Sequence, residues 1–245
     1  MKNPTTIKDI RTLALGAFFI TATTTAIIGL LQYQPVFDTS LPLESLADSA
    51  GDIRLGALFE MLLMAANIGT AAMLFPFLST TNRSWGIAYA AFRFMEVVLI
   101  GIGAISMLVL STWLTSGSRS QSDLPETVRS IYKWTMMAGP HFMLGINTAI
   151  YSTFMFRHRM IPRGIALLGI TGSILIFANA IAEIFQVRDV FSAATMTTAF
   201  PIAIFEMILA VWIIFKGLSV PAARALHDVE DPKQKQVELP GMAAE

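Results

Sequence analysis

Six long apolar runs constrain this chain more than any other feature of its sequence. A helix that crosses the hydrocarbon core of a bilayer needs about 20 mostly apolar residues. Runs of that length lie near residues 12–33, 53–79, 86–114, 130–156, 162–186 and 197–217. Only 14% of the 245 residues are charged, whereas a soluble domain carries about 25%. The sequence therefore predicts an all-α, polytopic transmembrane bundle with six spans.

The distribution of Lys and Arg predicts the orientation of this bundle. If the N-terminus is placed inside the cell, eleven Lys and Arg residues fall on the inner side and five on the outer side. Because cytoplasmic loops carry the excess of basic residues, we expect both termini to be cytoplasmic. This divides the chain into a cytoplasmic N-terminus over 1–11, a six-helix transmembrane domain over 12–217 and a cytoplasmic tail over 218–245. The prolines and alternating charges of the tail predict disorder.

A nine-residue stretch occurs twice, and each copy places a glutamate inside a predicted span. Residues 57–65 read ALFEMLLMA and residues 203–211 read AIFEMILAV, with five of nine positions identical, including Glu60 and Glu206. The spans that precede them also begin alike, with Arg11 before ALG and Arg163 before ALLG. The first and third helix hairpins are thus consistent with a parallel repeat. Chance similarity between apolar helices explains the match equally well.

The predicted spans contain a small set of ionisable side chains: Glu60, Arg93, Glu96, His141, Glu183 and Glu206. A charged side chain at the centre of a membrane helix costs roughly 2.5–3.5 kcal/mol on insertion scales. We therefore expect these groups to face the interior of the bundle, to pair with one another or to be neutral. From their positions in the spans, Glu60, Glu206 and His141 are expected to converge on one cavity in the outer leaflet.

Two of these positions allow alternative interpretations. Arg93 and Glu96 are three residues apart and share a helix face, so they can form an ion pair within their helix. Alternatively, Arg93 pairs across the bundle with Glu60 or Glu206. His141 follows Pro140, which is expected to kink its helix. The imidazole is then either a ligand or proton site beside the opened backbone, or a core histidine bonded to a glutamate.

Other polar residues have simpler interpretations. Asn67, Asn147 and Asn179 lie within spans, where amides commonly bond between helices, so they are predicted to stabilise packing. Arg157, Arg159 and Arg163 surround the connection between the fourth and fifth spans. They are predicted to fix topology and to contact anionic lipid headgroups.

Several chemistries are excluded or unsupported. The chain has no cysteine, and its zero net charge argues against a nucleic-acid partner. It contains no P-loop, no Gly-x-Ser-x-Gly elbow and no His-Glu-x-x-His motif. His141 with Glu60 and Glu206 would supply acceptable zinc ligands, but nothing in their spacing specifies a metal. We therefore predict no metal and no cofactor, and expect the bilayer, a small molecule or ion, and a homo-oligomer or membrane partner as the interacting species.

Four stretches together resemble a known family. They are LGALFEMLLMAANIG at 55–69, AYAAFRFMEVVLIGIGA at 88–104, MLGINTAIYSTFMFRHRMIPRGIALLGITG at 143–172 and FPIAIFEMILAVWIIFKG at 200–217. The chain is similar in these parts to the domain-of-unknown-function 4386 family of bacterial six-helix membrane proteins. The resemblance implies a six-span bundle in the bacterial inner membrane and implies no activity. The ionisable and proline residues in its motifs are Glu60, Arg93, Glu96, Arg157, Arg159, Pro162, Arg163 and Glu206.

Three functions fit this pattern. The first is a small-solute or ion-coupled carrier, in which protonation of Glu60 or Glu206 is coupled to opening of the bundle. The second is a sensor, regulator or assembly partner without turnover, in which the glutamates are structural. The third is a membrane-embedded enzyme acting on a lipid or quinone through His141 and the carboxylates. We favour them in this order, so the sequence leans away from an enzyme.

Overall fold

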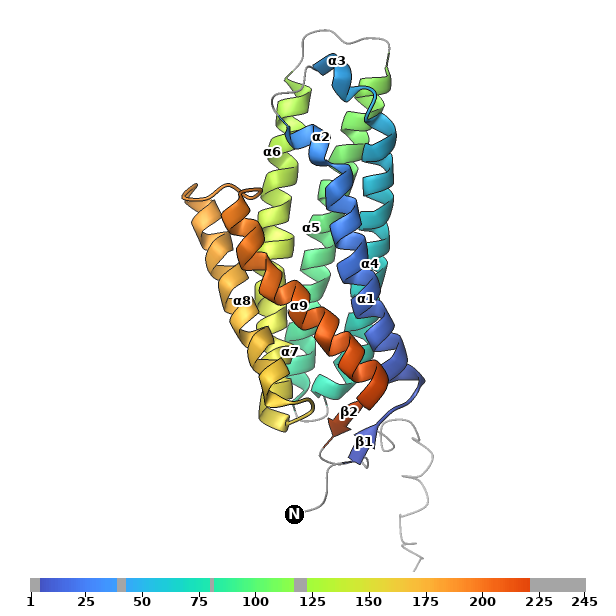
Figure 1. The fold of residues 1–245 in the computed structure, drawn as a ribbon, viewed down its shortest axis with the longest axis vertical. Helices are drawn as coiled ribbons and strands as arrows, with labels where there is room; N and C mark the ends of the chain where they lie inside the picture. Colours follow the sequence, from blue (N-terminus) through green and yellow to red (C-terminus); the bar gives the residue numbers. More distant parts are fainter. Residues whose placement is uncertain (1–4, 39–42, 80–81, 117–122, 221–245) are drawn as a thin grey trace, which may run out of the picture.

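Long helices make up most of the protein. The computed structural model describes residues 5–38, 43–79, 82–116 and 123–220, and their helical structure confirms the predicted all-α class (Figure 1). Five helices are long and apolar enough to cross a membrane. They are α1 (Ile10–Gln32), α4 (Ala50–Ser79), α5 (Arg83–Thr115), α8 (Arg163–Ile184) and α9 (Ala193–Lys216). Two short helices, α2 (Gln34–Phe37) and α3 (Leu43–Leu46), lie between α1 and α4.

The predicted fourth span is helical but not uniformly so. It consists of α6 (Leu124–Met136), the π-helix η1 (Met137–Met143) and α7 (Leu144–His158), which follow one another without a loop. Pro140 lacks a backbone N–H and cannot continue the regular hydrogen-bond ladder. Four residues after Pro140, the backbone N–H of Leu144 donates to the carbonyl of Gly139, five residues back. The kink predicted at Pro140 is therefore a π-helical turn.

The long segments form a closed ring in which each packs against the next. The order around the ring is α1, α4, α5, the α6–η1–α7 segment, α8 and α9, and α9 packs back on α1 (Figure 1). Small residues permit the closest approaches. A Cβ atom on Gly16 of α1 would lie 3.0 Å from the carbonyl oxygen of Ala210 on α9, and one on Gly172 of α8 would lie 3.1 Å from the backbone nitrogen of Ile202. The ring thus encloses a single interior, which α1 and α9 close.

Two clusters of buried apolar side chains fill the ends of this interior. One, here called the ribbon-end cluster, includes Leu15, Leu78 and Ile213. The other, the far-end cluster, includes Val36 and Leu114 together with neighbours from α4 and α6. The polar interior residues lie in the helical segments between these two clusters.

A short antiparallel ribbon joins the two ends of the described chain. Strand β1 (Thr5–Ile7) pairs with β2 (Leu218–Val220), with Ile7 opposite Leu218. Gly217 ends α9 with a φ of 73° and turns the chain into β2, a conformation that glycine adopts without strain. The first residues of the predicted tail are therefore paired, and α1 and α9 are tied together at one end. The rest of the predicted disordered tail, 221–245, lies outside the described residues.

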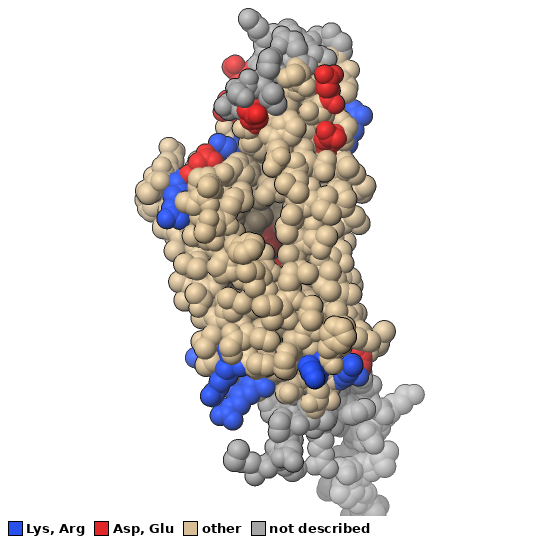
Figure 2. Space-filling model, in the orientation of Figure 1, with Lys and Arg blue, Asp and Glu red and all other residues tan. Residues whose placement is uncertain are grey.

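The surface is apolar along the flank and charged at the ends. Ile105, Ile174 and Phe200 are 60%, 62% and 65% exposed. In Figure 2, Lys and Arg gather at the end that carries the ribbon, while acidic residues gather mainly toward the opposite end. A broad apolar flank between two charged ends is what a bilayer requires.

Candidate functional site

All six ionisable residues predicted inside the spans are buried. Among the described residues, the interior of the bundle contains four carboxylates against one guanidinium and one imidazole; these residues are Glu60, Arg93, Glu96, His141, Glu183 and Glu206. The structure divides them into four groups: Arg93 with Glu96; Glu206; His141 with Glu183; and Glu60. The first three contribute to the wall of a central cavity.

The first group surrounds Glu96 on α5. Nη1 of Arg93 lies 3.1 Å from Oε2 of Glu96, so the two residues form the predicted ion pair within one helix. The amide of Asn67 on α4 donates to Oε1 of Glu96 at 3.2 Å and accepts from Nη1 of Arg93 at 3.2 Å. The amide of Asn147 on α7 donates to Oε2. Glu96 is therefore saturated by donors from three helical segments.

Arg93 is paired on one side only. Its Nε and Nη2 atoms are buried and have no hydrogen-bond partner in the part of the chain that the structure describes. The guanidinium lies over the ring of Tyr89, with its Cζ atom 5.8 Å from the ring centroid. It also interacts electrostatically with Glu206. Arg93 thus faces a second carboxylate, although its direct ion pair is with Glu96.

Glu206 is the least paired carboxylate of the interior. It lies on α9, five residues after Pro201, and is only 8% exposed. The hydroxyl of Thr23 on α1 donates to its Oε2 atom at 3.1 Å. The buried hydroxyl of Tyr151 on α7 also interacts with this carboxylate, although it forms no direct hydrogen bond within the described ranges. A carboxylate buried in an apolar bundle with one directly bonded hydroxyl retains capacity to bind a further donor or cation.

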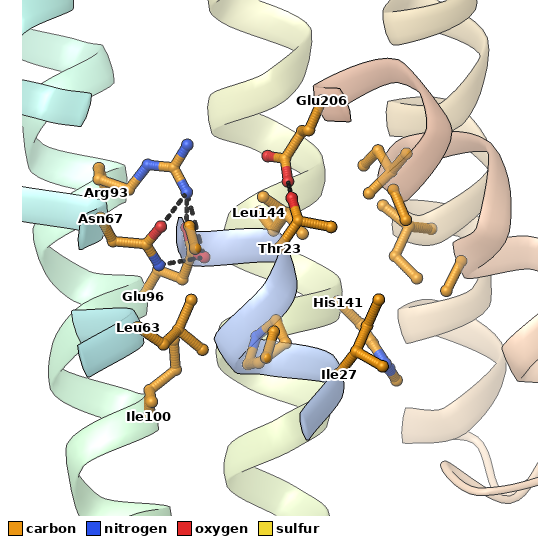
Figure 3. A pocket seen from close by; sticks show the side chains of 17 residues that line it. Thr23, Ile27, Leu63, Asn67, Arg93, Glu96, Ile100, His141, Leu144 and Glu206 are labelled. Atoms are coloured by element: carbon orange, nitrogen blue, oxygen red, sulfur yellow. Dashed lines mark hydrogen bonds and ion pairs between the residues drawn. The ribbon is translucent and has the colours of Figure 1, made fainter. Parts of the chain in front are cut away.

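A cavity of about 170 Å³ lies between these two groups. Every segment of the ring contributes to its wall. Figure 3 shows Arg93, Asn67 and Glu96 on one side of it, with Glu206 and Thr23 across from them. The remaining lining is mainly aliphatic, including Ile27, Leu63, Ile100, Ile176 and Ile202. The cavity therefore combines an apolar wall with one charged patch.

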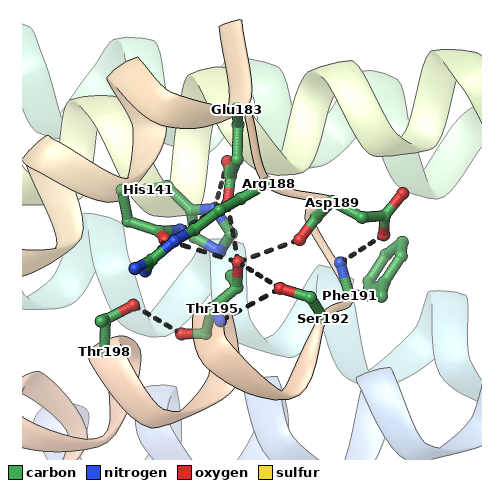
Figure 4. Close-up of polar contacts among 9 residues, drawn as sticks. His141, Glu183, Arg188, Asp189, Phe191, Ser192, Thr195 and Thr198 are labelled. Atoms are coloured by element: carbon green, nitrogen blue, oxygen red, sulfur yellow. Dashed lines mark hydrogen bonds and ion pairs between the residues drawn. The ribbon is translucent and has the colours of Figure 1, made fainter. Parts of the chain in front are cut away.

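His141 also lines this cavity, but its ring is held by a separate polar network. Nδ1 of His141 lies 2.8 Å from Oε2 of Glu183 on α8. Asn179 donates to the other carboxylate oxygen, and Arg188 donates to the carbonyl oxygen of the Asn179 side chain at 3.2 Å. Figure 4 shows this network continuing through Thr195 to the start of α9. The geometry matches the interpretation of His141 as a core histidine bonded to a glutamate.

Glu60 does not reach the cavity, contrary to the expected convergence. Its Oε1 and Oε2 atoms accept hydrogen bonds from Tyr132 at 2.6 Å and Tyr33 at 2.9 Å. Both tyrosines belong to the far-end cluster. The matched glutamates of the duplicated stretch therefore occupy different environments: one is saturated by phenols, and the other lines the cavity.

The separation of Glu60 also removes the conceivable zinc set of Glu60, Glu206 and His141. Within the described ranges, no group of three or more His, Asp or Glu side chains could hold a metal ion.

The three arginines near the connection between α7 and α8 lie away from the cavity. Arg157 is in the last turn of α7, Arg159 ends that helix with a positive φ of 52°, and Arg163 begins α8. The guanidinium of Arg163 lies 5.5 Å from the ring centroid of Phe156. Their predicted contact with lipid headgroups stays a prediction.

Some residues of the site were not indicated by the sequence. Thr23 belongs to the run TATTTA at 21–26, whose small polar residues suggest only helix packing. Tyr33 and Tyr132 lie near the ends of predicted spans, where tyrosine is expected at the membrane interface. Only the folded arrangement shows that they bind Glu60.

Apolar spanning helices around a buried polar cavity define an integral membrane protein. A family model described as "Domain of unknown function (DUF4386)" matches residues 14–217, and the chain belongs to this family. No curated protein and no solved structure matches the chain. The predicted resemblance is thereby confirmed, and the function has to be inferred from the site.

Proposed function

We propose that the protein is a small-solute or ion-coupled carrier with one central binding cavity. The observation that carries this proposal is the cavity itself, which all segments of the ring line and which contains an incompletely paired glutamate, Glu206. A site shared by every helix responds to binding by a change in the packing of the whole ring. Protonation or cation binding at Glu206 would then be coupled to opening of the bundle.

The topology proposed for this carrier has six spans, with the α6–η1–α7 segment as the fourth. Both termini are cytoplasmic, at the basic ribbon end, in the bacterial inner membrane. Support comes from the pairing of β1 with β2 and from the separation of charge between the two ends. The neighbouring pairs α1–α4 and α8–α9 are the proposed parallel repeat. Cysteine-accessibility labelling of single cysteines placed at Ser116 and Lys216 tests the orientation.

Proton flux in proteoliposomes tests the carrier. Vesicles containing the pH dye pyranine are given an acidic interior, and the membrane potential is clamped with potassium and valinomycin. Sodium, tetramethylammonium and glucose are then added outside, one at a time. We expect at least one addition to accelerate proton efflux in the wild type, and Glu206→Gln to reduce the flux to that of protein-free vesicles.

Glu60→Gln is the matched control, because Glu60 is also an intramembrane glutamate of the duplicated stretch but lies outside the cavity. We expect this variant to retain the wild-type flux. The carrier proposal fails if wild type and Glu206→Gln give the same flux under every condition.

One observation favours a membrane assembly partner without turnover as a second candidate. Glu60, Glu96 and Glu183 each have hydrogen-bond partners on both carboxylate oxygens, at least one of them from another segment, which is the arrangement of structural groups. Native extraction followed by size-exclusion chromatography distinguishes this candidate, because it requires a stable complex with a second chain that survives Glu206→Gln. The membrane-enzyme alternative has no comparable support.

A further inference from the structure

The opening of the cavity lies on the flank of the bundle. Figure 2 shows a hollow in the face that α1 and α9 form, with acidic atoms visible inside it. The helices are in closest contact at Gly16 and Ala210. Farther from the ribbon end, α1 contributes Thr23 and Ile27 to the cavity wall, and α9 contributes Ala199 and Ala203 there. Small side chains on α9 leave the gap between the two helices open.

Among the described residues, the ends of the bundle offer no comparable route. The ribbon-end and far-end clusters are formed by side chains that are almost completely buried, such as Leu15, Leu78 and Leu114. The flank around the hollow is apolar, with Ile27 and Phe200 52% and 65% exposed. A ligand that enters between α1 and α9 therefore crosses the hydrocarbon region and needs apolar surface of its own.

The charges that line the cavity select the sign of the ligand. The lining contains two carboxylates, Glu96 and Glu206, one guanidinium, Arg93, and the imidazole of His141, which is bonded to Glu183 outside the lining. Arg93 binds Glu96 directly, and Asn67 and Asn147 complete that group. The carboxylate without a direct ion pair is Glu206, which is nine-tenths buried, accepts one direct hydrogen bond from Thr23 among the described residues, and is otherwise near only the Tyr151 hydroxyl and, more remotely, Arg93. A buried charge of this kind is stabilised by a cation that also donates hydrogen bonds.

The volume limits the size of that cation. An apolar cavity of about 150 Å³ holds benzene, and the cavity here measures about 170 Å³. It therefore has room for a single small ring or a short branched alkyl group with one ammonium, and a whole phospholipid is too large to be enclosed in it. Its aliphatic wall, including Ile100, Ile176 and Ile202, provides the contact surface for such a group.

We propose that the cavity binds a small organic ammonium ion, which enters between α1 and α9 and places its charged group against Glu206. The hydrocarbon part of the ligand lies on the aliphatic wall. As a transported substrate this ligand rests on the proposed carrier function, but its binding can be measured without transport.

Three ligands with one ring and different charges test the proposal. Benzylammonium, benzyl alcohol and benzoate are titrated calorimetrically into the full chain in lipid nanodiscs, and the heats of empty nanodiscs are subtracted. We expect benzylammonium to bind at least about tenfold more tightly than benzyl alcohol, a difference of about 1.4 kcal/mol, and benzoate not to bind. Equal affinity for the ammonium and the alcohol overturns the proposal, as does preference for benzoate.

Variants locate the binding position. Glu206→Gln is expected to abolish the preference for benzylammonium over benzyl alcohol, whereas Glu60→Gln keeps it. Ala203→Phe narrows the gap between α1 and α9 and fills the cavity. It is therefore expected to lower the affinity for benzylammonium and for benzyl alcohol alike. If Glu206→Gln does not fold, as judged by size-exclusion profile and thermal melting, the comparison of the three ligands on the wild type decides alone. An unchanged preference in a folded Glu206→Gln overturns the proposal.

The outcome of the binding test is distinguishable from failure of the carrier proposal. Selective binding of benzylammonium without Glu206-dependent proton flux overturns the carrier and supports the ligand class. Glu206-dependent flux without selective binding of benzylammonium supports the carrier and overturns the proposed ligand class.

Discussion

Arg93 binds Glu96 through one of its terminal nitrogens, at 3.1 Å, while its other terminal nitrogen and its Nε atom are buried without a hydrogen-bond partner among the described residues. The two residues are three positions apart on α5, so the helix itself brings them to one face. The guanidinium also interacts electrostatically with Glu206 across the cavity. The same guanidinium thus neutralises one carboxylate and lowers the energy of a second.

Removing Arg93 alone is expected to be strongly destabilising. Arg93→Met leaves Glu96 buried without a counter-charge, and breaking a buried pair in this way costs about 3–5 kcal/mol. The double variant Arg93→Met with Glu96→Gln removes both charges and keeps one acceptor oxygen for the amides of Asn67 and Asn147. We expect it to recover part of that loss. Unfolding by SDS in mixed micelles measures the change, and a double variant as unstable as the single one contradicts the structural role of the pair.

Phenol hydrogen bonds to Glu60 are expected to contribute measurably to stability. Tyr33→Phe and Tyr132→Phe each remove one hydrogen bond to a buried carboxylate, and such a bond is worth about 1.5–3 kcal/mol. Tyr89→Phe is the matched control, because the Tyr89 hydroxyl is buried without a partner in the described part of the chain. Its removal is expected to be neutral or slightly stabilising. Equal melting temperatures for all three variants would contradict the assignment.

The contact of α1 with α9 depends on Gly16. A Cβ atom there would lie 2.5 Å from the side chain of Ile214 and 3.0 Å from the carbonyl oxygen of Ala210. We expect Gly16→Ala to destabilise the bundle by about 1–3 kcal/mol through overpacking. Gly51→Ala has nothing within 4 Å of the added atom and is expected to stabilise α4 slightly, because alanine is the better helix former. Thermal melting of the two variants in detergent compares them directly.

Asp189, in the loop between α8 and α9, gives a pH-dependent contribution. Partial burial raises its pKa, but the hydrogen bond and charge of Lys133 and the backbone N–H of Phe191 outweigh this effect and lower the pKa below its ordinary value of 3.8. A carboxyl with a lowered pKa stabilises the fold above its unfolded pKa, and that contribution is lost as the pH falls through the folded pKa. The pair is largely exposed, so it contributes less than about 1 kcal/mol.

The measurement is the difference in melting temperature between the wild type and Asp189→Asn from pH 6 to pH 3. We expect a small difference that disappears toward the acid end. A difference that grows as the pH falls would contradict the direction of the pKa shift.

The length of the apolar runs was enough to predict the helical class, and the scarcity of charge was enough to predict which ionisable residues are buried. Neither feature of the sequence could predict the partners of these buried residues. Glu60 and Glu206 have similar local sequences, with five of nine positions identical. Their different environments depend on which neighbours the ring provides, namely hydrogen bonds from two tyrosines for Glu60 and from one threonine for Glu206. The ion pair of Arg93 with Glu96 was one of two predicted alternatives, because three-residue spacing is visible in sequence, whereas contacts across the bundle are not.

The β ribbon was missed for a related reason. Each strand has three residues, too few for an alternating pattern to indicate a strand. Their pairing joins residues more than 200 positions apart in sequence. Only the closed ring brings the two segments together.

The same ribbon determines how the hollow between α1 and α9 can widen. These helices are pinned to each other at one end by β1 and β2 and by the contact at Gly16. We therefore expect the two helices to move relative to each other by rotation about that end. The separation would be largest away from the ribbon, where Ile27 and Ala199 line the cavity. We expect shortening of the ribbon to loosen this pivot without altering Glu206 or its hydrogen bond to Thr23.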